Sequence, residues 1–280
     1  MDSIRTKTRL RRPSCCPTMS CPGRLGAPAR EGRAPIGYNE GMIPLSTALI
    51  VIAVGAGAVA WVIYFRSKDR ASPEPLGLML AVAGAGALSV PVALAGYGGF
   101  EAAGLPTEWE ALAGDDLVWA VRVALRIGLV EELAKLLPVV AVVLFTRQLD
   151  EPLDGIIYAA CSALGLAAGE TIFLLRGGEL GLTEGIARAL SAPLSHALLS
   201  APWGLGFALF LLRRQRWGLP LGLGLSILLH GAYDLLLSRP ELPSFTASLL
   251  ILAVWIWLLV MTPRLTAQAH PPPAPSAAVV

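Results

Sequence analysis

The chain alternates between long apolar stretches and short polar segments. Seven stretches are about 20 residues or longer, enough for a helix to cross a hydrocarbon core of roughly 30 Å. Because backbone polar groups in lipid must be satisfied within their own segment, we expect each stretch to be a helix. The pattern predicts an all-α polytopic transmembrane bundle with helices over Ile43–Phe65, Leu76–Gly98, Leu117–Phe145, Gly155–Leu175, Ile186–Leu212, Gly218–Leu237 and Phe245–Thr262.

The composition supports a membrane protein. Of the 280 residues, 55% are hydrophobic and only 15% are charged, which is too apolar for an ordinary soluble domain. The formal net charge of +2 says little about partners, because membrane proteins place their charges in loops that set orientation.

Three regions are expected along the chain. Residues 1–41 are rich in Arg, Pro and Gly, cannot bury a core, and should form a disordered basic tail. Residues 42–262 should form one membrane domain. Residues 263–280 should form a disordered tail rich in Pro and Ala.

The basic residues of the loops predict the orientation. Those after the first, third and fifth stretches should be cytoplasmic, which also places the C-terminus in the cytoplasm and the N-terminus outside. The basic tail contradicts this orientation. Either the tail is translocated despite its charge, or translation begins at Met42, and we favour Met42. The loop residues concerned are Arg66, Lys68, Arg70, Arg147, Arg213, Arg214 and Arg216.

Several ionisable residues lie inside the predicted spans, where a charge costs at least about 2.5–3.5 kcal/mol. Many follow small residues at helical spacing, as in Gly222, Ser226, His230 and Asp234. Small residues mark the faces where membrane helices approach each other, so we expect these groups to point into the bundle. At about 1.5 Å per residue, Glu131, Glu170, His196 and His230 share a layer in the outer half of the membrane. The set is Glu131, Glu132, Lys135, Glu170, His196, His230 and Asp234.

A structural interpretation exists for each of these groups. Glu131 and Lys135, one turn apart, are able to neutralise one another in lipid. Glu170 or His196 is able to form a single inter-helix hydrogen bond, and Asp234 to fix the tautomer of His230. Since every such group costs insertion energy, we favour a shared functional role for the whole set.

The sequence resembles the PrsW family of intramembrane proteases, relatives of the CAAX-protease and bacteriocin-processing group, over about Met42 to Met261. The matching motifs are an acidic, double-proline loop at Tyr64–Leu76, Glu131-Glu132-Leu-Ala-Lys135, Asp150–Tyr158, Gly165–Glu170, Ser195-His196-Ala197 and Leu229–Asp234. The chain departs from the family pattern at Thr171, where Asn is expected after the glutamate.

The resemblance implies peptide-bond hydrolysis within or beside the membrane. Some members of the family act as site-1 proteases that cleave membrane-anchored anti-sigma factors on their outer side. It implies a multi-pass protein of a bacterial-type inner cell membrane, with a membrane-anchored protein substrate and the lipid bilayer as partners. We expect no nucleic-acid partner.

Two mechanisms are compatible with the acids and histidines. In the metal-free version, which we favour, Glu131 is the general base and His196 positions the water, while Glu132 or Glu170 orients the water or carries the proton to the amine. His230 then faces the oxyanion, with its tautomer set by Asp234, and Lys135 supports the paired glutamates. In the alternative version, zinc is bound by His196, His230 and a carboxylate such as Glu170.

Other functional classes use similar residues. Buried acids and histidines also form ion or proton pathways in transporters, but the inverted repeats and paired broken helices of such proteins are not evident here. A non-catalytic membrane scaffold is a further alternative, and it predicts no need for Glu131.

Overall fold

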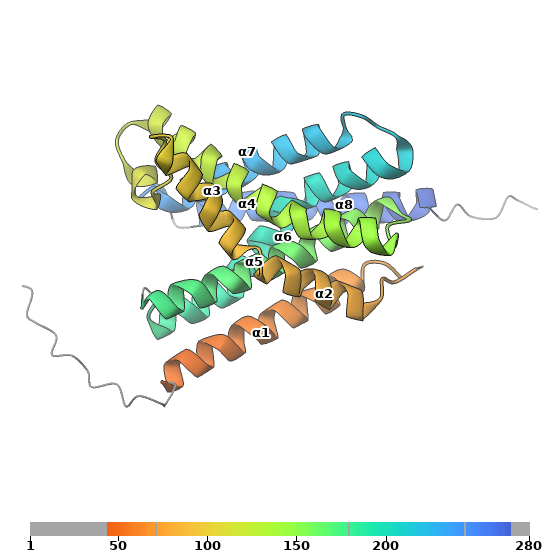
Figure 1. Cartoon of the computed structure of the whole chain (residues 1–280), viewed down its shortest axis with the longest axis horizontal. Coiled ribbons are helices and arrows are strands. Elements are labelled where there is room, and N and C mark those ends of the chain that lie inside the picture. The colour runs from red at the N-terminus through yellow and green to blue at the C-terminus, as the bar shows by residue number, and fades with distance from the viewer. Residues whose placement is uncertain (1–43, 71, 179, 244, 270–280) are drawn as a thin grey trace, which may run out of the picture. The chain divides into compact units, whose positions relative to one another are not determined.

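The computed structural model describes residues 44–70, 72–178, 180–243 and 245–269, and this part of the chain is helical without a strand. Figure 1 shows the helices packed side by side into a bundle. The predicted all-α polytopic architecture is therefore confirmed. The helices are α1 Leu45–Arg66, α2 Leu76–Ala87, α3 Val90–Ala102, α4 Leu117–Thr146, α5 Pro152–Gly177, α6 Leu182–Arg213, α7 Gly218–Ser238 and α8 Thr246–Ala269, with a short 3₁₀ helix η1 at Trp109–Ala113.

The second predicted helix is broken in the structure. It runs as α2 and α3, with the interruption at Leu88 and Ser89. Pro91 lies at the start of α3, and a proline lacks the backbone N–H and crowds the preceding turn, so a continuous helix through this point is unfavourable. The hydroxyl of Ser89 donates to the carbonyl of Gly86, which also accepts from the backbone N–H of Ser89.

Six helical segments of the described chain, counting Leu76–Ala102 as one, are long and apolar enough to cross a membrane. Helix α4, with 30 residues, is also long enough but carries five charged side chains. Its length of about 45 Å at 1.5 Å per residue fits a seventh crossing. The charges that set α4 apart are those of the predicted functional cluster together with Arg122 and Arg126.

The structure describes the two ends of the chain only in part. Helix α8 continues to Ala269, so its last seven residues belong to the stretch that the sequence assigns to the C-terminal tail. Residues 1–43 and 270–280 lie outside the described residues, and so do the predicted N-terminal tail and the proposed start at Met42.

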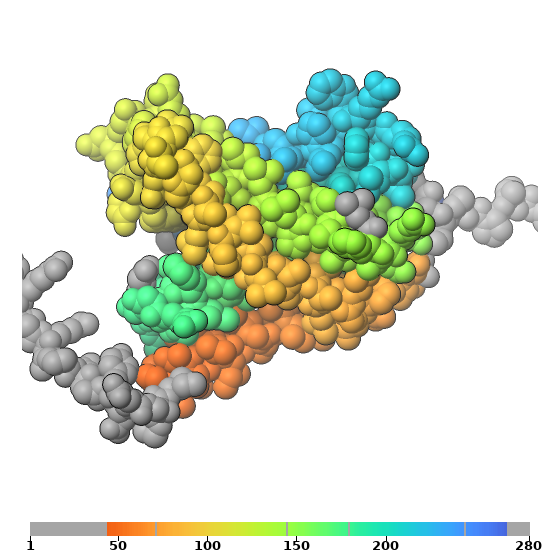
Figure 2. Space-filling model, in the orientation of Figure 1, coloured from red at the N-terminus to blue at the C-terminus, as the bar shows by residue number. Residues whose placement is uncertain are grey.

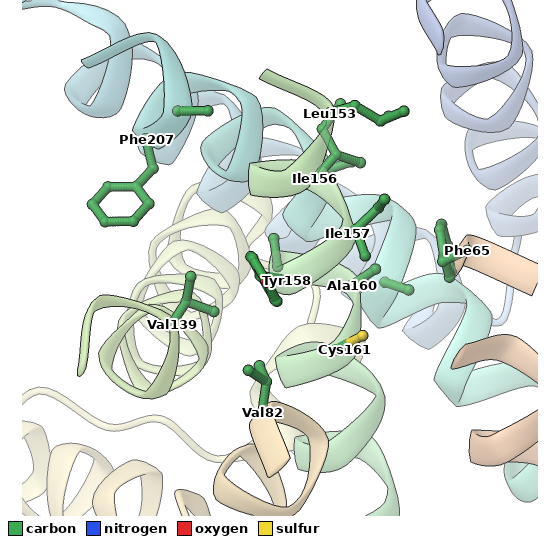
Figure 3. Packing of buried hydrophobic residues seen from close by; sticks show 14 of the residues in the cluster. Phe65, Val82, Val139, Leu153, Ile156, Ile157, Tyr158, Ala160, Cys161 and Phe207 are labelled. Carbon is green, nitrogen blue, oxygen red and sulfur yellow. The ribbon is translucent and has the colours of Figure 1, made fainter. Parts of the chain in front are cut away.

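Helix α5 is the central element of the bundle. Its residues from Pro152 to Ala167 are all buried, and it packs most extensively against α6 and α2. Figure 3 shows its Ile157, Tyr158 and Cys161 among side chains from other helices, including Phe65 of α1 and Val82 of α2. On the face shown in Figure 2, α2 and α3 run between α1 and α4.

Glycines set the close approach of α5 and α6. A Cβ atom at Gly155 would lie 2.2 Å from the carbonyl oxygen of Gly204, and one at Gly204 would lie 2.4 Å from that of Gly155. Only residues without a side chain allow the two backbones this separation. The crossing aligns α5, which carries Glu170, with α6, which carries His196.

Candidate active site

Three ionisable side chains from three helices meet inside the bundle. Glu131 of α4, His196 of α6 and His230 of α7 are all buried, and each offers one ligand atom within 4.8 Å of the other two. The two imidazole rings are edge-to-face, with their centroids 5.3 Å apart. We call Glu131, His196 and His230 the central triad.

The carboxylate of Glu131 occupies the middle of the triad. Its Oε2 lies 3.3 Å from Nε2 of His230, 3.5 Å from Nδ1 of His196 and 3.6 Å from Nζ of Lys135. Its Oε1 accepts a hydrogen bond of 2.9 Å from the hydroxyl of Tyr97 in α3. One oxygen of Glu131 is therefore held in place, while the other faces both histidines.

Glu132 shares Lys135 and His230 with Glu131 but also reaches α6, because adjacent residues on a helix differ in direction by about 100°. It is fully buried, and its Oε2 accepts from Ser200 Oγ at 2.7 Å and from Trp203 Nε1 at 2.8 Å. Its Oε1 accepts from Lys135 Nζ at 2.7 Å. Glu132 thus joins α4 to α6 through a saturated set of hydrogen bonds.

The same oxygen of Glu132 fixes the tautomer of His230. Nδ1 of His230 lies 2.6 Å from Oε1 of Glu132, and a contact of this length to a carboxylate requires a proton on the nitrogen. Nδ1 therefore donates, and in the neutral ring Nε2 presents its lone pair toward Glu131. The 3.3 Å approach of Lys135 Nζ to Nδ1 is then a contact between two donors that share one acceptor.

Glu170 and Asp234 border the central triad at longer distances. Oε2 of Glu170 lies 3.8 Å from Nε2 of His196 and 3.5 Å from Nη2 of Arg188. Oδ2 of Asp234 lies 3.7 Å from Nε2 of His230. The tautomer-setting bond expected from Asp234 is made by Glu132 in the structure, because Asp234 approaches the other nitrogen of the ring.

The donor set of the central triad fits a divalent metal ion. Oε2 of Glu131 and Nδ1 of His196 are buried without a hydrogen-bond partner, although buried polar atoms are normally satisfied. Two imidazoles and one carboxylate are a known ligand set for catalytic zinc. The zinc site expected from the sequence contained Glu170, whereas the carboxylate grouped with the two histidines is that of Glu131.

Four residues near the triad were not identified from the sequence as site residues. Ser200 follows His196 by one helical turn and Trp203 by two, so the spacing alone placed both on the face of His196. Tyr97 carried no such signal, because it lies on another helix, whereas Arg188 continues the four-residue spacing of Ala192 and His196 but lies near the predicted start of the span. They contact Glu131 and Glu170, respectively.

Two of the sequence motifs meet at the opposite end of α5. Glu74, in the loop before α2, accepts a hydrogen bond from the hydroxyl of Tyr158. Carboxylate oxygens of Glu74, Asp150 and Asp154 lie within 4.8 Å of one another, and Oδ2 of Asp154 accepts from the backbone N–H of Glu151 at 2.7 Å. This group ties the loop after α1 to the start of α5.

Comparison with known proteins identifies one family. Residues 74–262 match the model of the "PrsW family intramembrane metalloprotease". Protease PrsW of Geobacillus kaustophilus is 34% identical over 233 residues, which cover 81% of this chain and 96% of that protein. Protease PrsW of Bacillus subtilis is 31% identical over 213 residues, covering 74% of this chain and 90% of that protein.

A third protein with the same name is also similar to this chain. Protease PrsW of Oceanobacillus iheyensis is 29% identical over 217 residues, covering 76% of this chain and 94% of that protein. No solved structure shows a significant match. The matched region, residues 74–262, contains the whole central triad and every residue that contacts it.

Proposed function

The chain belongs to the PrsW family of intramembrane proteases, and we propose that Glu131, His196 and His230 form the centre at which it hydrolyses peptide bonds. The observation that carries this proposal is the unpartnered, buried oxygen of Glu131 between two imidazoles. A carboxylate beside imidazoles supplies the proton transfers that amide hydrolysis requires.

In the metal-free version, Oε2 of Glu131 accepts the proton of the attacking water. Tyr97 holds Oε1 of the carboxylate by a hydrogen bond, and the ammonium of Lys135 lies 3.6 Å from Oε2, so Oε2 keeps one direction. His196, between Glu131 and Glu170, then connects the base to a second carboxyl group that protonates the leaving amine. Over the whole reaction, one proton moves from the attacking water to the leaving amine as the C–N bond breaks.

His230 is held by Glu132 through its Nδ1. Its Nε2 faces the carboxylates of Glu131 and Asp234, and in the neutral ring with the proton on Nδ1 this nitrogen has a free lone pair. It accepts a hydrogen bond from the water or serves as a metal ligand. Glu132 is therefore a positioning residue, because it acts on the reaction only through His230.

In the metal version, Glu131, His196 and His230 hold the ion. A bound zinc ion would supply Lewis-acid polarisation of the peptide carbonyl and lower the pKa of water. Glu131 would then be a ligand, and Glu170, beside His196, would be the carboxylate that transfers the proton. Glu132 on the far side of His230 matches the carboxylate–histidine pairing common behind metal ligands.

A membrane-anchored protein is the substrate that fits a site placed among membrane-spanning helices. We propose cleavage near the outer side of the bilayer, with the C-terminus of the protease in the cytoplasm, because the basic loops lie at the opposite ends of the helices from Glu170 and Arg188. A site-1 cleavage of an anti-sigma factor is one such reaction, and a bacterial inner membrane is the corresponding location.

The proposal is tested by reconstituting the full chain in liposomes with a single-span protein substrate. Glu131→Gln, His196→Ala and His230→Ala should each reduce cleavage by about 10²-fold or more, the usual contribution of acid–base groups. Glu101→Gln, at an exposed acid at the end of α3, is the matched control and should cleave like wild type. Equal cleavage by all five proteins would contradict the proposal.

A second measurement separates the two mechanisms. The purified protein is chelated exhaustively, its metal content is measured by elemental analysis, and its cleavage rate is compared before and after zinc is restored. Activity that survives in a metal-free sample supports Glu131 as general base. Activity that disappears with the metal and returns with it supports Glu131 as a ligand.

A further inference from the structure

A groove of about 530 Å³ lies between the C-terminal half of α6, the N-terminal half of α7 and Trp257 of α8. Its volume is within the ~300–1,000 Å³ of typical small-molecule sites. Its walls include Leu209, Leu221 and Leu225, and Arg216 and Trp217 line it beside the α6–α7 connection. None of its lining residues belongs to the candidate active site.

The charge of the groove is one-sided. Its lining contains a single ionisable residue, Arg216, and no carboxylate. Among the described residues, Arg216 has no hydrogen-bond or ion-pair partner, and its side chain is exposed. A guanidinium at the mouth of an apolar groove favours a ligand with an anionic head and a hydrocarbon body.

The dimensions of the groove match one leaflet of a bilayer. From Trp217 to Leu225 the wall formed by α7 is about 12 Å long at 1.5 Å per residue. Half of a hydrocarbon core of roughly 30 Å is similar in depth. Trp217 and Leu221 are 73% and 69% exposed, so the groove opens to the surroundings of the bundle, which in a membrane are lipid.

The direction of the groove also agrees with a lipid. Arg216 and Trp217 lie just before α7, at the membrane surface, where arginine and tryptophan meet headgroups, and the leucines follow deeper in the span. Basic pockets between transmembrane helices bind anionic headgroups by this arrangement. Arg214, which follows the end of α6, adds positive charge to the same connection.

We propose that this groove is a binding site for an anionic glycerophospholipid. The headgroup phosphate contacts Arg216, and one acyl chain follows Leu221 and Leu225 toward the bilayer centre. The ligand comes from the leaflet that contains the α6–α7 connection, and its binding does not depend on catalysis.

Tryptophan quenching by brominated lipids tests the proposal, because Trp217 and Trp257 line the groove. The full chain is placed in phosphatidylcholine nanodiscs that contain a fixed minor fraction of brominated phosphatidylglycerol or of brominated phosphatidylcholine. The expected result is stronger quenching by the brominated phosphatidylglycerol. Replacing both tryptophans (Trp217→Phe and Trp257→Phe) should remove that difference.

The variant Arg216→Gln should lower the preference for phosphatidylglycerol by about fivefold, the factor for about 1 kcal/mol per basic residue near an anionic surface. Arg264→Gln is the matched control, since Arg264 is an exposed arginine near the end of α8 that does not line the groove. Equal quenching by the two lipids would overturn the proposal, and so would equal effects of the two arginine variants. Gel filtration before each measurement verifies that the proteins are folded.

Discussion

Nδ1 of His230 lies 2.6 Å from Oε1 of Glu132, across 98 residues of sequence. This bond links the machinery on α7 to a carboxylate on α4 that has no access to substrate, because Glu132 is fully buried. It supports the proposed division of the Glu-Glu motif, in which Glu131 is the reacting residue and Glu132 the positioning residue.

Glu132→Ala should destabilise the protein strongly. It would leave the ammonium of Lys135 buried without its 2.7 Å partner, and the donors Ser200 and Trp203 without an acceptor. Removing one partner of a buried ion pair costs about 3–5 kcal/mol. Thermal unfolding in detergent measures the effect, and Glu108→Ala, at an exposed acid, should change the free energy of unfolding by no more than about 0.5 kcal/mol.

A comparison with Glu131 separates stability from activity. Oε2 of Glu131 has no hydrogen-bond partner in the described structure, so Glu131→Gln should lower the unfolding temperature less than Glu132→Ala does, while cleavage falls by about 10²-fold or more. If Glu131→Gln were as unstable as Glu132→Ala, the division of roles between the two residues would be wrong.

Tyr97→Phe should slow cleavage about tenfold or more. The substitution removes the hydroxyl that donates to Oε1 of Glu131 but keeps the ring, which packs near Ala93 and Val130. A hydrogen bond to a charged group contributes about 1.5–3 kcal/mol, and 1.4 kcal/mol corresponds to a factor of ten. The rate is measured at saturating substrate.

The control for Tyr97 is Tyr64→Phe. The hydroxyl of Tyr64 accepts from Trp255 Nε1 at 3.0 Å, in a different part of the bundle from Glu131. Its removal should leave the cleavage rate unchanged. A rate loss of similar size in both variants would show that the effect of Tyr97 is general rather than directed at Glu131.

The sequence predicted the helices and the inward faces because both depend on local periodicity. Small residues four positions apart identify a helix-packing face wherever the helix lies, and His230 on such a face is buried. Pro91 contained the signal for the break between α2 and α3, although the long apolar run concealed it.

Which residues contact each other within the site depends on tertiary structure, so local spacing did not predict it. Asp234 lies four residues after His230, so local spacing favoured it as the partner of the ring. The crossing of α4 with α7 instead brings Glu132 to Nδ1 and leaves Asp234 3.7 Å from Nε2. Tyr97 could not be predicted for the same reason, since only the packing of α3 on α4 brings it to Glu131.

Gly155→Ala should destabilise the bundle at the crossing of α5 and α6. The added methyl would lie 2.2 Å from the carbonyl oxygen of Gly204 and 2.8 Å from Cβ of Ala208, so the helices must separate. Overpacking of this kind costs about 1–3 kcal/mol. Gly77→Ala is the control, because a Cβ there meets nothing within 4 Å. An unfolding temperature lowered equally by both changes would contradict this prediction.

Glu74 should make the stability of the protein depend on pH. Burial raises the pKa of this carboxyl above its ordinary value of 4.5, so the folded state binds its proton more tightly than the unfolded chain does. A group with a raised pKa contributes its full stability below the unfolded pKa and loses it as the pH rises through the folded value. The free energy of unfolding should therefore fall as the pH is raised from about 4.5.

Glu74→Gln removes this titration but keeps an oxygen that accepts from Tyr158. Its stability relative to wild type should increase as the pH rises, because wild type must bury an ionised carboxylate beside Asp150 and Asp69 whereas the variant stays neutral. The unfolding temperature is measured in detergent across this pH range, with Glu108→Gln as the exposed control. Parallel pH profiles for wild type and Glu74→Gln would show that Glu74 does not titrate in the range and would contradict the prediction.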